Sequence, residues 1–158
     1  MEDFVTEFME EAIRLSLEKM QQKEGGPFGA VIVRNGEIIA RGWNRVSSTN
    51  DPTAHAEIVA IKEACLKIGD FWLGGCDLYV NCEPCPMCLG AIYWSGIKRV
   101  FFAATRKDAA GAGFADNYIY EELFKPVADR NMVMTQMMRD SALPVFEIWD
   151  KMEDKIEY

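Results

Sequence analysis

Apolar residues recur at helical spacing near the start of the chain. Residues 4 to 20 carry two adjoining apolar stripes, Phe4, Phe8, Ala12 and Leu15 on one and Val5, Met9, Ile13 and Leu17 on the other. Spacings of three and four residues place side chains on one side of a helix. The pattern therefore predicts a first helix that covers a core.

Two β-rich runs follow a Gly-Gly-Pro break at 25–27. FGAVIVR and EIIARGW flank the dipeptide Asn35-Gly36. Both residues tolerate the positive φ that a tight type I′ turn requires, so this stretch predicts a β-hairpin.

A second helix is expected from Asp51-Pro52 onward, with Asp51 as its cap and Pro52 in its first turn. Its apolar face would carry Ala54, Ile58, Ile61, Cys65 and Ile68. On this assignment His55 lies in the first turn of the helix.

The middle of the chain alternates strand and helix. DLYVNC and KRVFFAA read as strands, and CEPCPMCLGAIYWSG between them reads as a tight loop that opens a short third helix. A hairpin followed by this alternation predicts an α/β fold with a mixed sheet between helices.

The last third of the chain has weaker signals. Residues 104–116 are small and Gly-rich, which favours a loop, whereas 117–124 favours a helix and VMTQMM at 133–138 a β-like run. A last helix is expected after Pro144, with Phe146, Trp149 and Met152 on one face. Because no repeat or linker is present, residues 1–158 are expected to form a single domain.

Composition and charge narrow the class of protein. The 158 residues are 49% hydrophobic and 27% charged, as in ordinary globular proteins. The net charge of −8 disfavours nucleic acid as a partner. The start of the chain has no export signal and no run approaches the roughly 18 apolar residues of a membrane span, which predicts a cytoplasmic protein with no membrane partner.

The cysteines and the single histidine suggest a metal site. Of the five cysteines, Cys85 and Cys88 are spaced so that both thiols face one way on a helical turn. Together with His55 they form a ligand set of one nitrogen and two sulfurs, which suits zinc and leaves a fourth position for water. We expect one Zn²⁺ per chain; a buried pair of packing cysteines is the alternative.

Glu57 presents a geometric difficulty, because residues two apart lie on opposite sides of a helix. If the helix points its tip at the metal, His55 and Glu57 can both reach it. Glu57 would then move protons to and from the water without binding zinc. A solvated glutamate in the first turn is the alternative.

Cys82 opens a rival interpretation. Cys82, Cys85 and Cys88 together read C-x-x-C-x-x-C, which could seat an iron–sulfur cluster or close a four-ligand structural zinc site. A zinc-stabilised binding protein without catalysis is a further alternative, although such a site has no use for Glu57.

His-x-Glu at 55–57 and Pro-Cys-x-x-Cys at 84–88 form a pattern known from zinc nucleobase deaminases. The chain resembles the cytidine deaminase-like superfamily from about residue 5 to 105, through GGPFGAVIV, GWN, DPTAHAEIVAI and CEPCPMCLGAIYW. The resemblance implies a three-layer fold with a mixed five-stranded sheet between helices. It also implies zinc on His55, Cys85 and Cys88, with Glu57 as proton shuttle.

Within this superfamily the chain is most similar to the bacterial guanine deaminases, through SSTNDPTAHAE, AGFADNYIYEE and the terminal KIEY. This likeness implies hydrolytic deamination of guanine, a small nucleobase, to xanthine and ammonia. It places Asp116 at the site as a catalytic or substrate-contacting group. The implied substrate contacts are Phe28, Asn44, Ala56, Trp94, Asp116 and Tyr158.

Several alternatives stay open at this point. Core packing is the other interpretation of Phe28 and Trp94, and a frayed end that of Tyr158. Guanosine or another aminated heterocycle could replace guanine. A tRNA adenosine deaminase shares GWN, DPTAHAEI and the Pro-Cys-x-x-Cys half, but the acidic ending DKMEDKIEY does not suit RNA. The family also suggests a homodimer, in which a swapped C-terminal segment of about 117–158 covers the partner's site.

Overall fold

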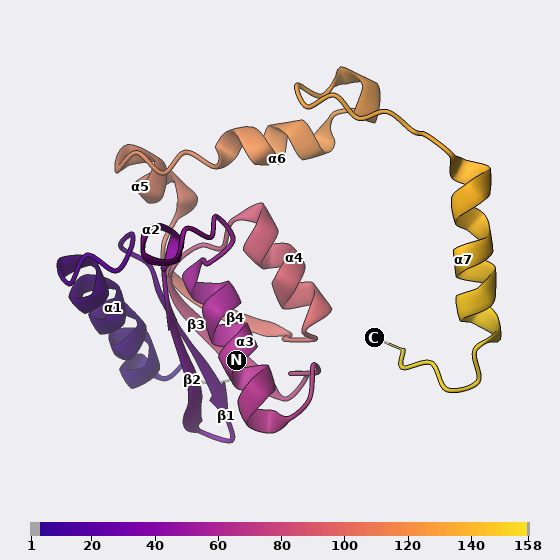
Figure 1. The fold of residues 1–158 in the computed structure, drawn as a ribbon. Coiled ribbons are helices and arrows are strands. Elements are labelled where there is room, and N and C mark those ends of the chain that lie inside the picture. The colour runs from indigo at the N-terminus through magenta and orange to yellow at the C-terminus, as the bar shows by residue number, and fades with distance from the viewer. Residues whose placement is uncertain (1–3, 158) are drawn as a thin grey trace. The chain divides into compact units, whose positions relative to one another are not determined.

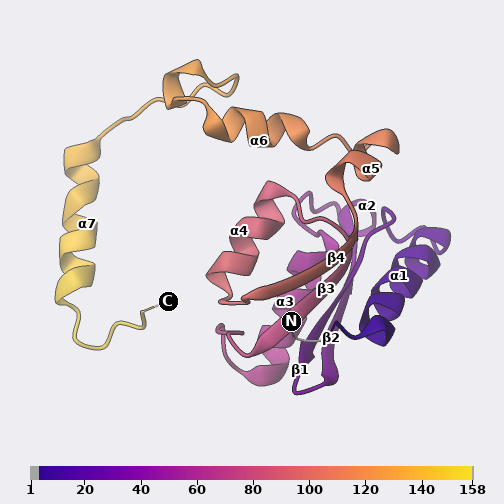
Figure 2. The same ribbon diagram turned by 180° about the vertical axis from the view of Figure 1, so that it is seen from behind.

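The computed structural model describes residues 4–157 and divides the chain into two compact units, the first ending at Asn117 and the second running from Tyr118. Figures 1 and 2 show both units from opposite sides. Each unit is described by itself below.

A mixed sheet forms the centre of the first unit. Its order is β2-β1-β3-β4, in which the first two neighbouring pairs are antiparallel and β3 and β4 are parallel. The strands are β1 (Gly29–Arg34), β2 (Glu37–Trp43), β3 (Cys76–Cys82) and β4 (Arg99–Ala104). The expected α/β fold with a mixed sheet is confirmed, but within residues 4–157 the sheet has four strands and not the expected five.

Helices cover both faces of this sheet. Helix α1 (Thr6–Gln21) packs on one face, and α3 (Ala56–Ile68) and α4 (Pro86–Trp94) lie over the other (Figures 1 and 2). Because both faces are covered, β1 is apolar from Gly29 to Val33, with Ala30 and Ile32 in the core under α3 and Val31 and Val33 in the core under α1.

The hairpin between β1 and β2 is confirmed. Asn35 has φ 53° and Gly36 has φ 78°, so both central residues of the turn take the positive φ that the Asn-Gly dipeptide predicts.

Two local predictions are wrong. Asp51 does not cap the second helix, because its Oδ1 accepts hydrogen bonds from the backbone and hydroxyl of Thr53, and the helix begins at Ala56 with His55 as its N-cap. A short helix α2 (Val46–Thr49) precedes this turn. The Gly-rich stretch after residue 104 also holds a helix, α5 (Arg106–Gly111), since Thr105 and Asp108 form a reciprocal capping box.

The second unit contains three short elements in sequence. They are α6 (Asn117–Phe124), the 3₁₀ turn Val127–Asp129 and α7 (Arg139–Lys151). The first residue of α6, Asn117, still belongs to the first unit. The helix at 117–124 is confirmed, whereas the last helix begins five residues before Pro144 and contains it. A proline inside a helix removes one backbone hydrogen bond and crowds the carbonyl of the preceding turn, so Pro144 weakens α7 locally without ending it.

The β-like run at 133–138 forms no strand, which corrects the prediction. A strand exists only through a hydrogen-bonded neighbour, and the described residues provide none for this run. No residue between 118 and 157 is buried. Among residues 4–157, no helix is both long and apolar enough to cross a membrane.

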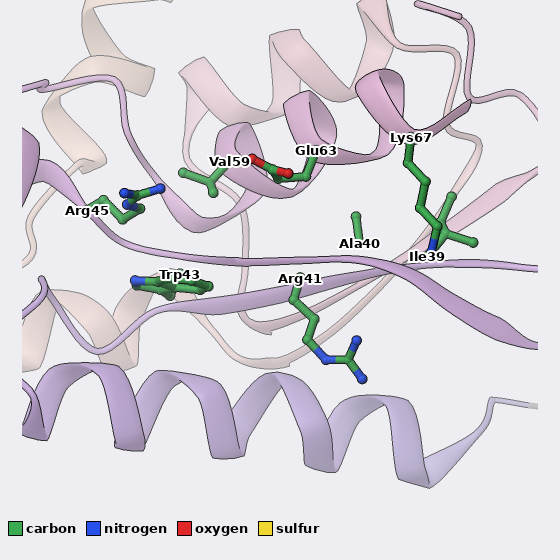
Figure 3. A pocket seen from close by; sticks show the side chains of 8 residues that line it. All are labelled: Ile39, Ala40, Arg41, Trp43, Arg45, Val59, Glu63 and Lys67. Atoms are coloured by element: carbon green, nitrogen blue, oxygen red, sulfur yellow. The ribbon is translucent and has the colours of Figure 1, made fainter. Parts of the chain in front are cut away.

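A pocket of about 380 Å³ lies between the edge strand β2 and helix α3 (Figure 3). Its lining contains Ile39, Ala40, Arg41, Trp43, Arg45, Val59, Glu63 and Lys67. None of the candidate site residues is among them. Cationic side chains beside an edge strand discourage pairing with another sheet, so these charges protect β2.

Glu11 ties α1 to the edge of the sheet. Its carboxylate accepts from Arg14 Nε at 2.7 Å and from Arg41 Nε of β2 at 2.6 Å. The hydrogen bond with Arg14, followed by that with Arg41, lowers the pKa of Glu11 to about 2.

We predict that Glu11→Gln lowers the free energy of unfolding by about 1 kcal/mol at pH 7, because both arginines are half-exposed and solvent weakens the pairs. A carboxyl whose pKa is depressed on folding stabilises above its unfolded pKa of about 4.3 and loses this as pH falls through about 2. The difference between the two proteins in denaturant titrations should therefore shrink from pH 5 to pH 3. An equal difference at both pH values would contradict the pairing.

Candidate metal centre

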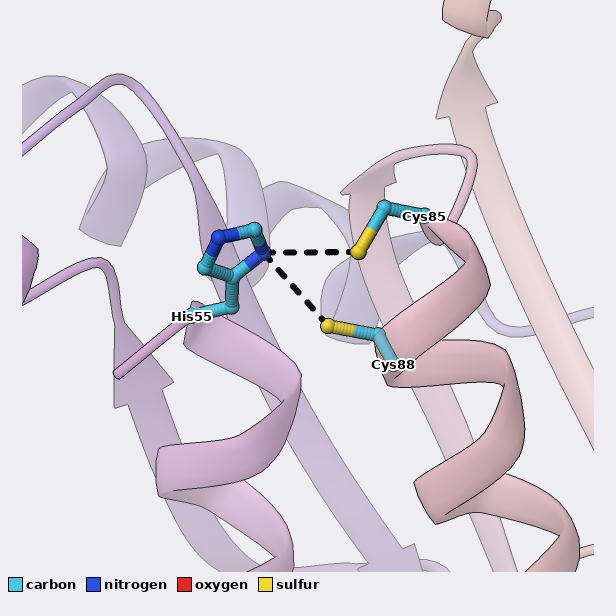
Figure 4. Close-up of side chains that lie close together, drawn as sticks. All are labelled: His55, Cys85 and Cys88. Atoms are coloured by element: carbon cyan, nitrogen blue, oxygen red, sulfur yellow. Dashed lines mark hydrogen bonds between the residues drawn. The ribbon is translucent and has the colours of Figure 1, made fainter. Parts of the chain in front are cut away.

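The N-termini of α3 and α4 bring the three candidate metal ligands together (Figure 4). His55 is the N-cap of α3 and Cys85 is the N-cap of α4; both have extended backbones, with ψ of 158° and 168°. Neither side chain forms a capping hydrogen bond. Both side chains can therefore point from the helix tips toward each other, and Cys88 joins them from the first turn of α4.

The spacing of these atoms fits a tetrahedral zinc ion. Cys85 Sγ lies 3.5 Å and Cys88 Sγ lies 3.6 Å from His55 Nδ1, and the three ligand atoms are all within 4.8 Å of one another. Zinc with ordinary bond lengths and tetrahedral angles would separate a nitrogen and a sulfur ligand by about 3.6 Å. One ion therefore fits between these three side chains, with a fourth position left for water.

One of the two thiols, Cys85, is shifted toward the thiolate form that a metal needs, and Cys88 is its proton-sharing partner. The hydrogen bond from Cys88 lowers the pKa of Cys85 to about 4, and His55 lowers it further against the opposing effect of burial. The same contact and burial raise the pKa of Cys88. The hydrogen bond to Cys85 raises the pKa of His55. The Cys85 thiolate thus shares protons with Cys88 and His55, and a metal cation can take the place of such shared protons.

Glu57 lies beside this cluster as the second residue of α3. The side chain is buried, and burial raises the pKa of its carboxyl group. The carboxyl group is also in contact with the Cys88 thiol. Because His55 precedes the helix in extended conformation, the two residues flank the helix tip and do not have to share a helix face.

Cys82 lies outside the cluster. Its Sγ donates to the backbone carbonyl of Thr105 at 3.7 Å, and burial raises its pKa to about 11. Within residues 4–157, the group of side chains close enough to share a metal consists of His55, Cys85 and Cys88. This geometry disfavours a site with Cys82 as fourth ligand.

Asp116 approaches the cluster from the loop after α5. Burial raises the pKa of its carboxyl group, and its charge contributes to the raised pKa of His55. Oδ1 of Asp116 is buried and has no hydrogen-bond partner among the described residues. A buried acceptor without a partner is costly, so this oxygen is available to a substrate or water.

The loop that carries Asp116 packs on Phe28 through Phe114. The two rings meet edge to face, with centroids 4.9 Å apart and an angle of 86° between the planes. Sequence reasoning missed Phe114, although an aromatic residue in a Gly-rich stretch could have indicated it.

The other candidate substrate contacts lie at different distances from the cluster. Asn44 and Ala56 are buried, Ala56 as the first residue of α3. Trp94 is 71% exposed and closes α4 nine residues after Cys85, about 13 Å along the helix axis, so the chain does not bring it to the cluster. Tyr158 lies outside the described residues.

Comparison with known proteins identifies the family. A model of the cytidine and deoxycytidylate deaminase zinc-binding region matches residues 3–104, which contain all three cluster residues and Glu57. The chain belongs to this family. The guanine deaminase of Bacillus subtilis is 50% identical over 151 residues, covering 96% of this chain and 97% of that protein. A tRNA-specific adenosine deaminase of Aquifex aeolicus is 43% identical over 114 residues, covering 72% and 75%.

Solved structures of two guanine deaminases also match this chain. The X-ray structure of the Bacillus subtilis guanine deaminase matches with a TM-score of 0.95 and 48% identity over 99% of both chains. A structure of guanine deaminase from Nitrosomonas europaea matches with a TM-score of 0.66 and 34% identity, covering 69% of this chain and 63% of that one. This family member is therefore a homologue of guanine deaminases along its whole length, and of tRNA adenosine deaminases along most of it.

We predict that Cys85→Ala loses bound zinc whereas Cys82→Ala retains it, because the Cys85 thiol lies 3.5 Å from His55 Nδ1 whereas the Cys82 thiol faces the carbonyl of Thr105. Metal content of the purified proteins by mass spectrometry measures the difference. Cys82 is the matched control, since both substitutions remove one thiol from neighbouring positions. Equal zinc loss from both variants would support the four-ligand site instead.

Proposed function

We propose that this protein is a zinc-dependent guanine deaminase that hydrolyses guanine to xanthine and ammonia. The observation that carries the proposal is the match to the Bacillus subtilis guanine deaminase over 96% of this chain and 97% of that protein. The match to the tRNA-specific enzyme is less extensive, at 72% of this chain. The net charge of −8 also favours a small nucleobase over RNA.

His55, Cys85 and Cys88 would hold one Zn²⁺ per chain. Two thiolates and a neutral imidazole balance the charge of the ion, and the cluster leaves one side for water. Zinc, when bound, lowers the pKa of a coordinated water so that hydroxide is available near neutral pH.

Glu57 would carry the protons. Its buried carboxyl group has a raised pKa, as a group must have that both takes up and releases a proton near neutral pH. It takes one proton from the attacking water and delivers it to a ring nitrogen of guanine, and it then moves the second proton of that water oxygen to the leaving amine. The water oxygen becomes the second carbonyl oxygen of xanthine, and the amine departs as ammonia.

Phe28, Asn44 and Ala56 would hold the flat base beside Glu57, and the unpartnered Oδ1 of Asp116 would accept from a substrate N–H or assist proton transfer. Trp94 and Tyr158 would contact the substrate that is bound to a second copy of the chain. For Trp94 the reason is its position at the far end of α4 from Cys85.

We infer a homodimer in which the segment of about 117–158 covers the partner's site. The support is the exposure of apolar side chains in the second unit, where Phe146 is 68% and Trp149, on the same face of α7, 40% exposed. An amphipathic helix normally buries its apolar face, so α7 is suited to cover another surface. On this proposal the two units belong to one functional domain, in a protein of the cytoplasm.

A substrate panel tests the function. Purified zinc-loaded protein is mixed with guanine, guanosine, adenine, cytosine and a tRNA anticodon stem-loop, and ammonia release is measured. We expect guanine to be the best substrate. Preference for guanosine or the stem-loop would assign one of the other deaminase activities, and no ammonia from any of them at one zinc per chain would indicate a binding protein.

We predict that Glu57→Gln lowers the turnover of guanine by about 10²–10⁴-fold, because proton transfer by a positioned group contributes this much. Gln has the same shape and cannot exchange protons. Zinc content should stay near that of the unmodified protein. Loss of zinc from this variant would mean that Glu57 belongs to the metal site itself.

We predict that two inactive variants restore activity when co-expressed. One chain carries Glu57→Gln and the other lacks Tyr158. If the tail acts on the partner, a mixed dimer contains one intact site, and about a quarter of all sites recover in a statistical mixture. Differently tagged chains allow the mixed dimer to be purified. No recovery in that dimer would place the tail over its own chain's site.

A further inference from the structure

Asn81 holds the backbone on both sides of Phe28. Its Oδ1 accepts from the backbone N–H of Gly29 at 2.9 Å, and its Nδ2 donates to the backbone carbonyl of Pro27 at 3.0 Å. Asn81 is half-buried near the end of β3, one residue before Cys82. One amide group therefore bridges β3 to the two residues that flank Phe28.

The backbone of the Phe28 segment is fixed from the other direction by Asn44. The N–H of Asn44 donates to the carbonyl of Phe28 at 3.0 Å, and its Oδ1 accepts from the N–H of Gly26 at 3.1 Å. Four hydrogen bonds from two asparagines thus determine where residues 26–29 lie. Since Asn44 is itself a proposed substrate contact, Asn81 is the member of this pair that can be altered separately.

The side chain of Phe28 carries this placement toward the site. Its ring meets Phe114 edge to face at 4.9 Å, and Phe114 stands two residues before Asp116. A displacement of the Phe28 backbone would therefore move one aromatic wall and loosen the loop that bears Asp116.

We propose that Asn81 is a positioning residue that sets the affinity for the nucleobase by fixing Phe28, a role that rests on the proposed function. Both polar atoms of the Asn81 side chain bind backbone groups, Oδ1 that of Gly29 and Nδ2 that of Pro27. Asn81 therefore acts on the substrate site through this backbone and not by contact with substrate. An aromatic wall contacts a flat base equally before and during the reaction, so loss of its placement weakens binding more than turnover.

Steady-state kinetics of a double-mutant cycle tests the proposal. Asn81→Ala should raise KM for guanine by about tenfold and change kcat by less than about twofold. Phe28→Ala should give a similar rise in KM, and the double variant should be no worse than Phe28→Ala, because Asn81 acts through that ring. Independent, multiplied effects of the two substitutions would overturn the proposal.

Glu11→Gln is the matched control. It weakens the same sheet through α1 and β2 and makes no contact with the Phe28 segment. It should lower the melting temperature while leaving KM unchanged in assays well below melting. If Asn81→Ala behaves in the same way, Asn81 serves only the stability of the fold.

Hydrogen–deuterium exchange separates this inference from the proposed function, because it requires no turnover. In Asn81→Ala, peptides covering 26–29 and 112–116 should exchange faster, and peptides from the middle of α3 should not change. Unchanged exchange at 26–29 would overturn the positioning role even if guanine is the substrate. Faster exchange in a protein that releases no ammonia would retain the role of Asn81 in holding Phe28 and reject guanine deamination.

Discussion

Helix α3 approaches the sheet so closely that a side chain at residue 42 would collide with it. A Cβ on Gly42 would lie 2.1 Å from the carbonyl oxygen of Ala56 and 2.5 Å from the backbone nitrogen of Ala60. Small residues at the contact, Ala56, Ala60 and Ala64, allow the same approach from the helix side. Because α3 begins at Ala56, this contact determines where His55 and Glu57 stand relative to the rest of the site.

Two of the metal ligands, His55 and Cys85, stand at helix tips. A helix N-terminus has backbone N–H groups without internal partners and a partial positive charge, which stabilises a nearby thiolate. His55 and Cys85 cap their helices through the backbone alone, so neither side chain is consumed by the cap. The two tips together form an electropositive site whose side chains are available to a cation.

Sequence patterns predicted the elements that local chemistry decides. Asn35-Gly36 can form few turns other than the one observed, and the spacing of Cys85 and Cys88 brings them to one side of α4. The predicted start of α3 is wrong because the Asp51 carboxylate accepts hydrogen bonds from Thr53 in a local turn. His55 is therefore the N-cap. The helix after Thr105 was within reach, since Thr and Asp three residues apart are a capping signal. The conformation of residues 133–138 could not be predicted, because a strand depends on a neighbouring strand as well as on its own residues.

The apolar character of β1 on both faces has a consequence for strand register. In a half-buried strand, a slip by one residue would expose its apolar face, and that cost fixes the pairing. In β1 such a slip would exchange Ala30 and Ile32 for Val31 and Val33 between two cores that are both apolar. Next to the turn at Asn35-Gly36 the pairing with β2 is set by the turn, and it shifts by one residue between Val33, opposite Ile38, and Ile32, opposite Ala40. Asn81 belongs to the other neighbour of β1, the strand β3, in which Val80 lies opposite Ala30. Its hydrogen bonds to Gly29 and Pro27 therefore also hold the β1–β3 register, at the end of the strand where the turn has no influence.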